Sequence, residues 1–220
     1  MAMRRANGDG RVRIAILARA PQPGLAKTRL IPRLGEQGAA SLQRWLLQRA
    51  VATALAADTG PVELWCAPDE RHPDFEVCRA LGPLRLHRQP EADLGARMLA
   101  ALAQTPAQPT LVIGTDCPAL TPALLRRAAA CLRDGDDDAV VLPAEDGGYV
   151  LIGLREAAAA PFAGVAWGGA QVMAQTRARL AALGWRWSEP ATLWDVDRPA
   201  DFDRLAALCP DMLDWLREAA

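Results

Sequence analysis

Short, continuously apolar runs alternate along this chain with longer segments that carry apolar residues at helical spacing. The clearest apolar runs are residues 12–18, 62–67 and 110–114, and helical patterns of roughly 10 to 20 residues separate such runs. This alternation is typical of parallel βα units, in which helices cover both faces of a sheet whose strands have no polar face. The sequence therefore predicts one α/β domain with three layers, α/β/α, around a mostly parallel mixed sheet.

The individual elements can be placed from the same periodicity. Strands are expected at residues 12–18, 62–67, 84–87, 110–114, 139–142 and 149–154. Helices are expected at residues 37–57, 74–81, 94–104, 122–133, 170–183, 199–208 and 212–218. Thr121 and Pro122 suit the N-cap and the first position of their helix. The domain is expected to span residues 11–220, after a loose tail at residues 1–10.

Length and charge exclude several classes of protein. A chain of 220 residues fits one large domain, and 25 basic against 26 acidic residues argue against a nucleic-acid binder. No run approaches the 18 or so apolar residues of a membrane span, and the first apolar run is too short for a signal peptide. Five cysteines without a C-x-x-C pair make a disulfide framework or a cysteine metal site improbable, and a cytoplasmic location is expected.

Only one of the 25 basic side chains is a lysine, Lys27, and it lies just after the first expected strand. Lysine differs from arginine in being a compact point charge, so a single lysine among arginines suggests a specific task. The same segment holds Arg19, Gly24, Thr28 and Arg29. Its cations and backbone N–H groups suit a diphosphate or triphosphate, although it is neither a Walker A loop nor a dinucleotide fingerprint. A solvated basic connector is the alternative interpretation.

Carboxylates follow two later apolar segments. Asp116 comes directly after the strand at 110–114, and Asp195 and Asp197 precede the helix that begins at Pro199. Carboxylates at such positions can hold a divalent cation against phosphate oxygens. The alternatives are local. Asp116 would cap a turn, and we expect Asp195 and Asp197 to reach one metal only if their segment bends, so that one binds and the other caps the helix.

A further loop joins the strands expected at 139–142 and 149–154. It contains Gly147 and Gly148, which allow a backbone to approach a ligand closely, and Tyr149, the only tyrosine, whose ring could border a base or sugar. A plain tight turn is the alternative. Taken together, the cationic loop, Asp116 and the late pair of aspartates predict metal-assisted chemistry on a nucleotide phosphate, with Lys27 and Arg29 as the catalytic cations.

Five ordered motifs resemble a known family: ARAPQPGLAKTRL, ADLGARM, GTDCPAL, LPAEDGGYVLIGL and DVDRPADF. This is the bacterial transferase family described as similar to 2-phospho-lactate guanylyltransferase, and the resemblance covers residues 12–207. It implies the nucleotide-diphospho-sugar transferase (glycosyltransferase A) fold, with the nucleotide bound over the first loop. It further implies nucleotide-phosphate contacts from Gly24, Lys27 and Arg29. It also implies Mg²⁺ or Mn²⁺ ligands at Asp116, Asp195 and Asp197.

The expected activity is nucleotidyl transfer from a nucleoside triphosphate to a small phosphorylated acceptor, with release of pyrophosphate. A glycosyltransferase's D-x-D is absent at Thr115-Asp116-Cys117, which favours nucleotidyl over glycosyl transfer. Glycosyl transfer from a nucleotide-sugar stays open, as does a nucleotide-binding protein without turnover. The chain departs from the family pattern at Ala92 and at residues 168–170. The expected partners are the nucleotide and a small-molecule acceptor, and a homodimer is left open.

Overall fold

The computed structural model describes residues 10–218, so the tail expected at residues 1–10 lies outside them except for Gly10. Within this range the strands form one sheet in the order β3-β2-β1-β4-β6-β5-β7. The strands are β1 Arg13–Arg19, β2 Val62–Ala67, β3 Leu84–Arg88, β4 Thr110–Ile113, β5 Ala139–Pro143, β6 Tyr149–Leu154 and β7 Trp187–Ser188. Strand β6 is antiparallel to β4 and β5, and every other pair is parallel. The mostly parallel mixed sheet is confirmed.

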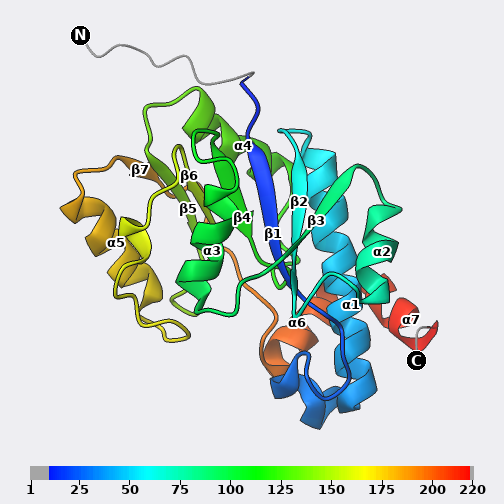
Figure 1. Cartoon of the computed structure of the whole chain (residues 1–220). Helices are drawn as coiled ribbons and strands as arrows, with labels where there is room; N and C mark the ends of the chain where they lie inside the picture. Colours follow the sequence, from blue (N-terminus) through cyan, green and yellow to red (C-terminus); the bar gives the residue numbers. More distant parts are fainter. Residues whose placement is uncertain (1–9, 219–220) are drawn as a thin grey trace.

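Helices cover both faces of this sheet. They are α1 Ile31–Ala57, α2 Pro73–Arg79, α3 Leu94–Ala103, α4 Pro122–Arg133, α5 Val172–Ala182, α6 Pro199–Leu208 and α7 Asp211–Glu218, with 3-10 turns η1 Thr28–Leu30 and η2 Ala160–Phe162. Figure 1 shows α3 and α5 in front of the sheet and α1 and α4 behind it. The side chain of Thr121 accepts from Leu124 N (3.2 Å), which confirms the expected cap of α4. No helix over the described residues is long and apolar enough to cross a membrane.

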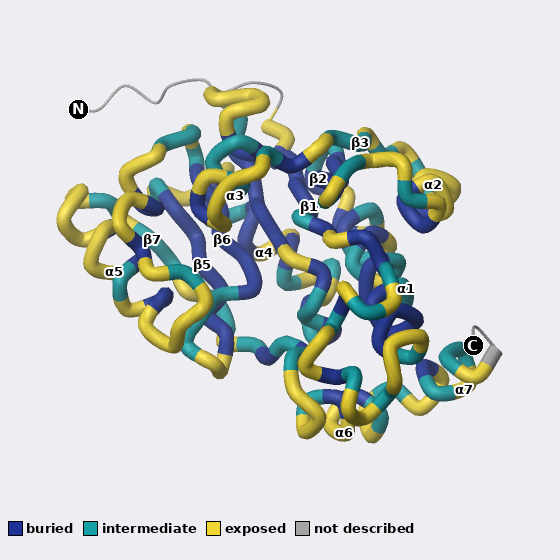
Figure 2. The backbone as a smooth tube through the Cα atoms, turned by 60° about the horizontal axis from the view of Figure 1, so that its bottom comes forward, coloured by how far each residue is buried: buried dark blue, intermediate teal, exposed yellow. Residues whose placement is uncertain are grey.

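The central strands are largely apolar because they are buried on both sides, and the charged exceptions Arg13 of β1 and Glu63 of β2 form a buried ion pair (2.6 Å). In β4, Leu111 and Ile113 pack into the core shared with α1 and α4, whereas Val112 packs into the opposite core with α3 and α5. The tube in Figure 2 is accordingly dark blue along the central strands, and the exposed segments lie in the outer helices and loops. Helix α1 begins before the expected residue 37, and a non-helical Gly35 (φ +70°) interrupts its first turns.

A third, smaller core lies beyond the carboxyl ends of β1 and β4. It joins η1, α1, α6 and the segment before α6, and its buried members include Leu30, Leu42, Trp194, Val196 and Phe202. Segments at opposite ends of the chain therefore pack on each other. This packing places the loop after β1 beside residues 195–197.

Candidate functional site

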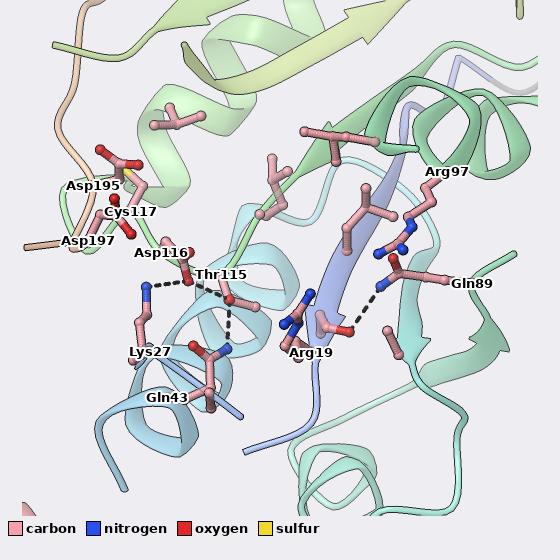
Figure 3. A pocket seen from close by; sticks show the side chains of 18 of the residues that line it. Arg19, Lys27, Gln43, Gln89, Arg97, Thr115, Asp116, Cys117, Asp195 and Asp197 are labelled. Carbon is pink, nitrogen blue, oxygen red and sulfur yellow. Dashed lines mark hydrogen bonds and ion pairs between the residues drawn. The ribbon is translucent and has the colours of Figure 1, made fainter. Parts of the chain in front are cut away.

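A pocket of about 480 Å³ opens at the carboxyl ends of the parallel strands, the edge at which α/β proteins bind ligands. Its lining includes the loop after β1, the turn after β4, the start of α3 and the segment before α6. Figure 3 shows how their side chains converge. Eight residues predicted from the sequence line this pocket: Arg19, Lys27, Thr28, Arg29, Asp116, Tyr149, Asp195 and Asp197.

Lys27 lies at the acidic end of this pocket and is not a solvated connector. Its side chain is only 5% exposed, its Nζ donates to Val196 O (2.6 Å), and the same nitrogen lies 2.9 Å from Asp116 Oδ1. Its backbone is left-handed (φ 48°, ψ 44°), which costs a residue with a Cβ roughly 1–2 kcal/mol. Strain of this kind gathers at functional sites. The backbone and the ion pair together direct the one ammonium group toward the carboxylates.

Asp116 follows β4 and is half-exposed on the pocket side. Its Oδ1 accepts from Thr115 Oγ1 (2.9 Å) as well as pairing with Lys27. Its backbone O accepts from Val196 N (2.8 Å), which fixes the turn against the segment before α6. Because Thr121 caps α4, the Asp116 carboxylate is not needed as a helix cap.

Asp195 and Asp197 lie on one face of their extended segment. Trp194 and Val196 point into the third core, and alternate residues of an extended chain share a face, so both aspartates line the pocket without a bend. That both aspartates reach one metal only if their segment bends stays a prediction. Neither aspartate caps α6, because the Asp201 side chain accepts from the backbone N–H groups of Asp197 and Arg198 just before the helix. Asp197 forms an ion pair with Arg29.

The carboxylates at the acidic end of the pocket repel one another. Burial, followed by the charges of Asp146 and Asp116, raises the pKa of Asp195 from 3.8 to about 6, and Lys27 opposes this rise. A carboxylate whose ionised form is destabilised in this way is a favourable setting for a cation. No role was predicted from the sequence for its charged neighbour Asp146, which lies in the β5–β6 loop.

The raised pKa of Asp195 predicts a specific dependence of stability on pH. Because the folded protein holds this proton more tightly than the unfolded chain, the free energy of unfolding contributed by Asp195 falls as pH rises from about 4 to about 6. Asp195→Asn removes that loss. We expect the variant to melt at a higher temperature than the wild type at pH 7, and the gain to shrink at about pH 4.5.

Thermal melts of the metal-free protein at both pH values measure this effect. Asp203→Asn is the matched control, because Asp203 is an exposed aspartate paired with Arg33 outside the pocket. A lower melting temperature for Asp195→Asn at pH 7 would contradict the inferred repulsion.

The pocket is also lined by three polar residues that were not predicted from the sequence: Gln43, Gln89 and Arg97. Gln89 follows β3, and its buried amide donates to Ala18 O (3.0 Å) and Trp65 O (2.6 Å). The Nε of Arg97 donates to Ala92 O (2.7 Å). Gln89 comes directly after a strand, β3, which is a signal that could have found it. Gln43 stands on the buried face of a long helix and leaves no comparable signal.

The glycines predicted to contact the nucleotide do not line this pocket. Gly147 (φ +92°) packs so closely that a Cβ would lie 2.1 Å from Ala170 O, and Gly148 closes the same turn by accepting from Ala144 N (3.0 Å). Gly24 (φ +77°) forms the turn before Lys27. These glycines shape the loops around the pocket.

Tyr149 does line the pocket, where its hydroxyl donates to the sulfur of Met98 (3.7 Å). Burial raises the pKa of Tyr149 above its ordinary value of 10.0, so the ring borders the pocket as a neutral phenol.

Solved structures share this fold. A Desulfovibrio desulfuricans G20 protein inferred to be a nucleotide-diphospho-sugar transferase is 26% identical, with a TM-score of 0.77 over 94% of this chain and 97% of that chain. CMP:2-keto-3-deoxy-manno-octonic acid synthetase in complex with CTP is 15% identical, with a TM-score of 0.57 over 91% and 99%. Rv0371C of Mycobacterium tuberculosis H37Rv in complex with manganese is 18% identical, with a TM-score of 0.53 over 88% and 97%.

These similarities confirm the nucleotide-diphospho-sugar transferase fold that the sequence motifs implied. A search of curated proteins found no match. A family model does match residues 50–169, which is more than half of the chain. The chain belongs to the family described as an uncharacterized protein conserved in bacteria, DUF2064.

Proposed function

We propose that this protein is a metal-dependent transferase that moves the nucleotidyl group of a nucleoside triphosphate to a small phosphorylated acceptor and releases pyrophosphate. The observation that carries the proposal is the buried Lys27, which has a left-handed backbone and pairs with Asp116 at the carboxyl ends of the parallel strands. The similar structures of this fold, one of them with CTP bound, support a nucleotide as the ligand.

Asp116 and Asp195 fit a divalent cation. Both line the pocket, and their oxygens are the hard donors that Mg²⁺ and Mn²⁺ prefer. Burial and then the charges of Asp146 and Asp116 raise the pKa of Asp195, and a bound cation would stabilise its ionised form. Among residues 10–218 no group of three or more histidine, cysteine or acidic side chains is assembled as a metal site. This suits a metal that one or two carboxylates and substrate phosphates hold together. The charge of Asp116 acts on Asp195, whereas Asp197 pairs with Arg29, so we propose Asp116 and Asp195 as the two metal ligands.

When bound, Mg²⁺ or Mn²⁺ supplies Lewis-acid polarisation of the phosphate oxygens. A phosphate oxygen of the acceptor attacks the α-phosphorus and forms a new P–O bond. The bond from the α-phosphorus to the bridging oxygen breaks, and its electron pair leaves with pyrophosphate. Lys27 and Arg29 donate to the phosphate oxygens and stabilise the negative charge that develops on the leaving group.

Release of pyrophosphate separates this reaction from its alternatives. The assay incubates the protein with Mg²⁺ or Mn²⁺, each nucleoside triphosphate, and sugar phosphates or phosphorylated hydroxy acids as acceptors. We expect pyrophosphate from one triphosphate, dependent on both acceptor and metal. Release of a nucleoside diphosphate from a nucleotide-sugar, without pyrophosphate, would indicate glycosyl transfer instead. Tight nucleotide binding with neither product would indicate a binding protein without turnover.

Gln89 is positioned to recognise the nucleotide. Because its Nε2 donates to two backbone carbonyls, the orientation of its amide is fixed and Oε1 is left as the only acceptor of the group. Figure 3 shows this amide at the pocket wall beside Arg97. We expect Gln89→Leu to weaken binding of the preferred triphosphate by about tenfold, the scale of one lost hydrogen bond.

The dissociation constant, measured by a thermal-shift titration with Mg²⁺, checks this prediction. Gln108→Leu is the control, since Gln108 precedes β4 at the opposite edge of the sheet and donates to Arg11 O (3.4 Å). An unchanged dissociation constant in Gln89→Leu would remove Gln89 from the binding site.

A further inference from the structure

A chain of hydrogen bonds runs from the middle of α1 to the acidic end of the pocket. Gln43 Nε2 donates to Thr115 Oγ1 (3.0 Å), and Thr115 Oγ1 donates to Asp116 Oδ1 (2.9 Å). Lys27 Nζ lies 2.9 Å from the same Oδ1. The dashed lines of Figure 3 follow this path across four side chains from three segments of the chain. The Asp116 carboxylate, which we propose as a metal ligand, is therefore held in place by Thr115 and Lys27.

The direction of every hydrogen bond in the chain is determined by chemistry. An ionised carboxylate only accepts, so the single hydroxyl proton of Thr115 goes to Asp116. The hydroxyl oxygen must then accept from Gln43, which fixes the amide with Nε2 toward Thr115. Oδ1 of Asp116 thus accepts a hydrogen bond from Thr115 and forms the ion pair with Lys27, whereas no partner of Oδ2 is seen among residues 10–218.

The burial of these hydrogen-bonded side chains indicates a role beyond packing. Gln43 is 4% exposed and Thr115 is 6% exposed, and Gln43 stands among the apolar residues that α1 buries. A buried amide costs free energy that an apolar side chain of the same size would not, unless it is hydrogen-bonded. An apolar side chain would fill the same space but could not orient Thr115.

We propose that Gln43 and Thr115 are positioning residues that lock the Asp116 carboxylate, with Oδ1 engaged and Oδ2 presented to the divalent cation. This inference rests on the proposed function, because it assumes that Asp116 binds the metal. Neither residue touches the reacting atoms in this scheme. Groups that orient metal ligands in this way typically change metal affinity by 10- to 100-fold when they are removed.

The test is direct binding of Mn²⁺, measured by electron paramagnetic resonance of the free ion, with and without the preferred triphosphate. Thr115→Val keeps the side-chain shape and removes the hydroxyl, and we expect it to raise the Mn²⁺ dissociation constant by about 10-fold or more. Thr115→Ser keeps the hydroxyl and loses a methyl group, and we expect it to stay within about threefold of the wild type. A packing role would give the reverse order.

Two further variants complete the test. Gln43→Leu should weaken Mn²⁺ binding in the wild-type background and add nothing to Thr115→Val, because it acts only through that hydroxyl. Ser41→Ala is the matched control: Ser41 is a buried hydroxyl on the same helix without a hydrogen-bond partner among residues 10–218, and its loss should leave Mn²⁺ binding unchanged.

In a turnover assay, Thr115→Val should raise the Mn²⁺ concentration needed for half-maximal rate more than it lowers kcat at saturating Mn²⁺. Wild-type Mn²⁺ affinity in Thr115→Val, or equal losses in the valine and serine variants, would overturn the positioning role alone. A wild-type protein that binds Mn²⁺ neither alone nor with any triphosphate would overturn the proposed function together with this inference.

Discussion

Lys27→Ala is expected to lower turnover by about 10²-fold or more, the usual effect of removing one electrostatic stabiliser of a transition state. The ammonium is the only lysine charge in the chain and lies, nearly buried, beside the carboxylates at the pocket. Alanine also carries a Cβ, so the left-handed backbone strain is nearly the same in both proteins. The loss of rate can therefore be attributed to the ammonium group rather than to the loop.

The measurement is the initial rate of pyrophosphate release at saturating triphosphate and metal, together with a thermal melt. We expect the melting temperature to change by only a few degrees, since the partner carboxylate Asp116 is half-exposed and can be hydrated. Arg33→Ala, which removes an exposed cation from the start of α1, is the control and should keep full activity. Full activity in Lys27→Ala would exclude the loop after β1 from catalysis.

Asp116→Asn is expected to have the largest effect, a fall in turnover of about 10³-fold. Metal ions contribute several kcal/mol of charge stabilisation in phosphoryl chemistry, and each 1.36 kcal/mol is about a factor of ten in rate. The amide keeps the shape of the side chain but removes the charge that pairs with Lys27 and would bind the cation. The residual rate should no longer depend on Mn²⁺ at concentrations that saturate the wild type.

Asp214→Asn is the matched control, because Asp214 is an exposed aspartate on α7 paired with Arg217. Its rate and its Mn²⁺ dependence should equal those of the wild type. If Asp116→Asn kept the wild-type dependence on Mn²⁺, the metal would have to bind elsewhere.

The order and type of the larger elements were predictable because the sheet is buried on both faces. Largely apolar strands such as β2 and β6 stand out between amphipathic helices, and their predicted ends agree with the structure. Strand β7, Trp187–Ser188, was not predicted, since two residues form no apolar run. The reversed direction of β6 follows from its pairing with β4 and β5, which local periodicity does not encode.

The site was predictable where it follows a strand directly, as at Asp116, or where composition isolates one residue, as at Lys27. The charges of Asp116 and Asp146 act on Asp195 because of the third core, which packs the segment before α6 against the loop after β1. Gln43 is a helix residue on a buried face, and only its three-dimensional contact with Thr115 gives it a role. Such contacts between distant segments are what the sequence pattern leaves out.

The central claim is that the pocket binds a nucleotide together with a divalent metal. A thermal-shift panel of GTP, CTP, UTP and ATP, with nucleotide-sugars and with or without Mg²⁺ or Mn²⁺, tests it most directly. A ligand at 100 times its dissociation constant adds about 2.7 kcal/mol of stability, which corresponds to roughly 5–10 °C for a chain of this size. We predict such a shift for one triphosphate, only in the presence of metal and absent in Asp116→Asn. No shift with any nucleotide, with or without metal, would contradict the claim.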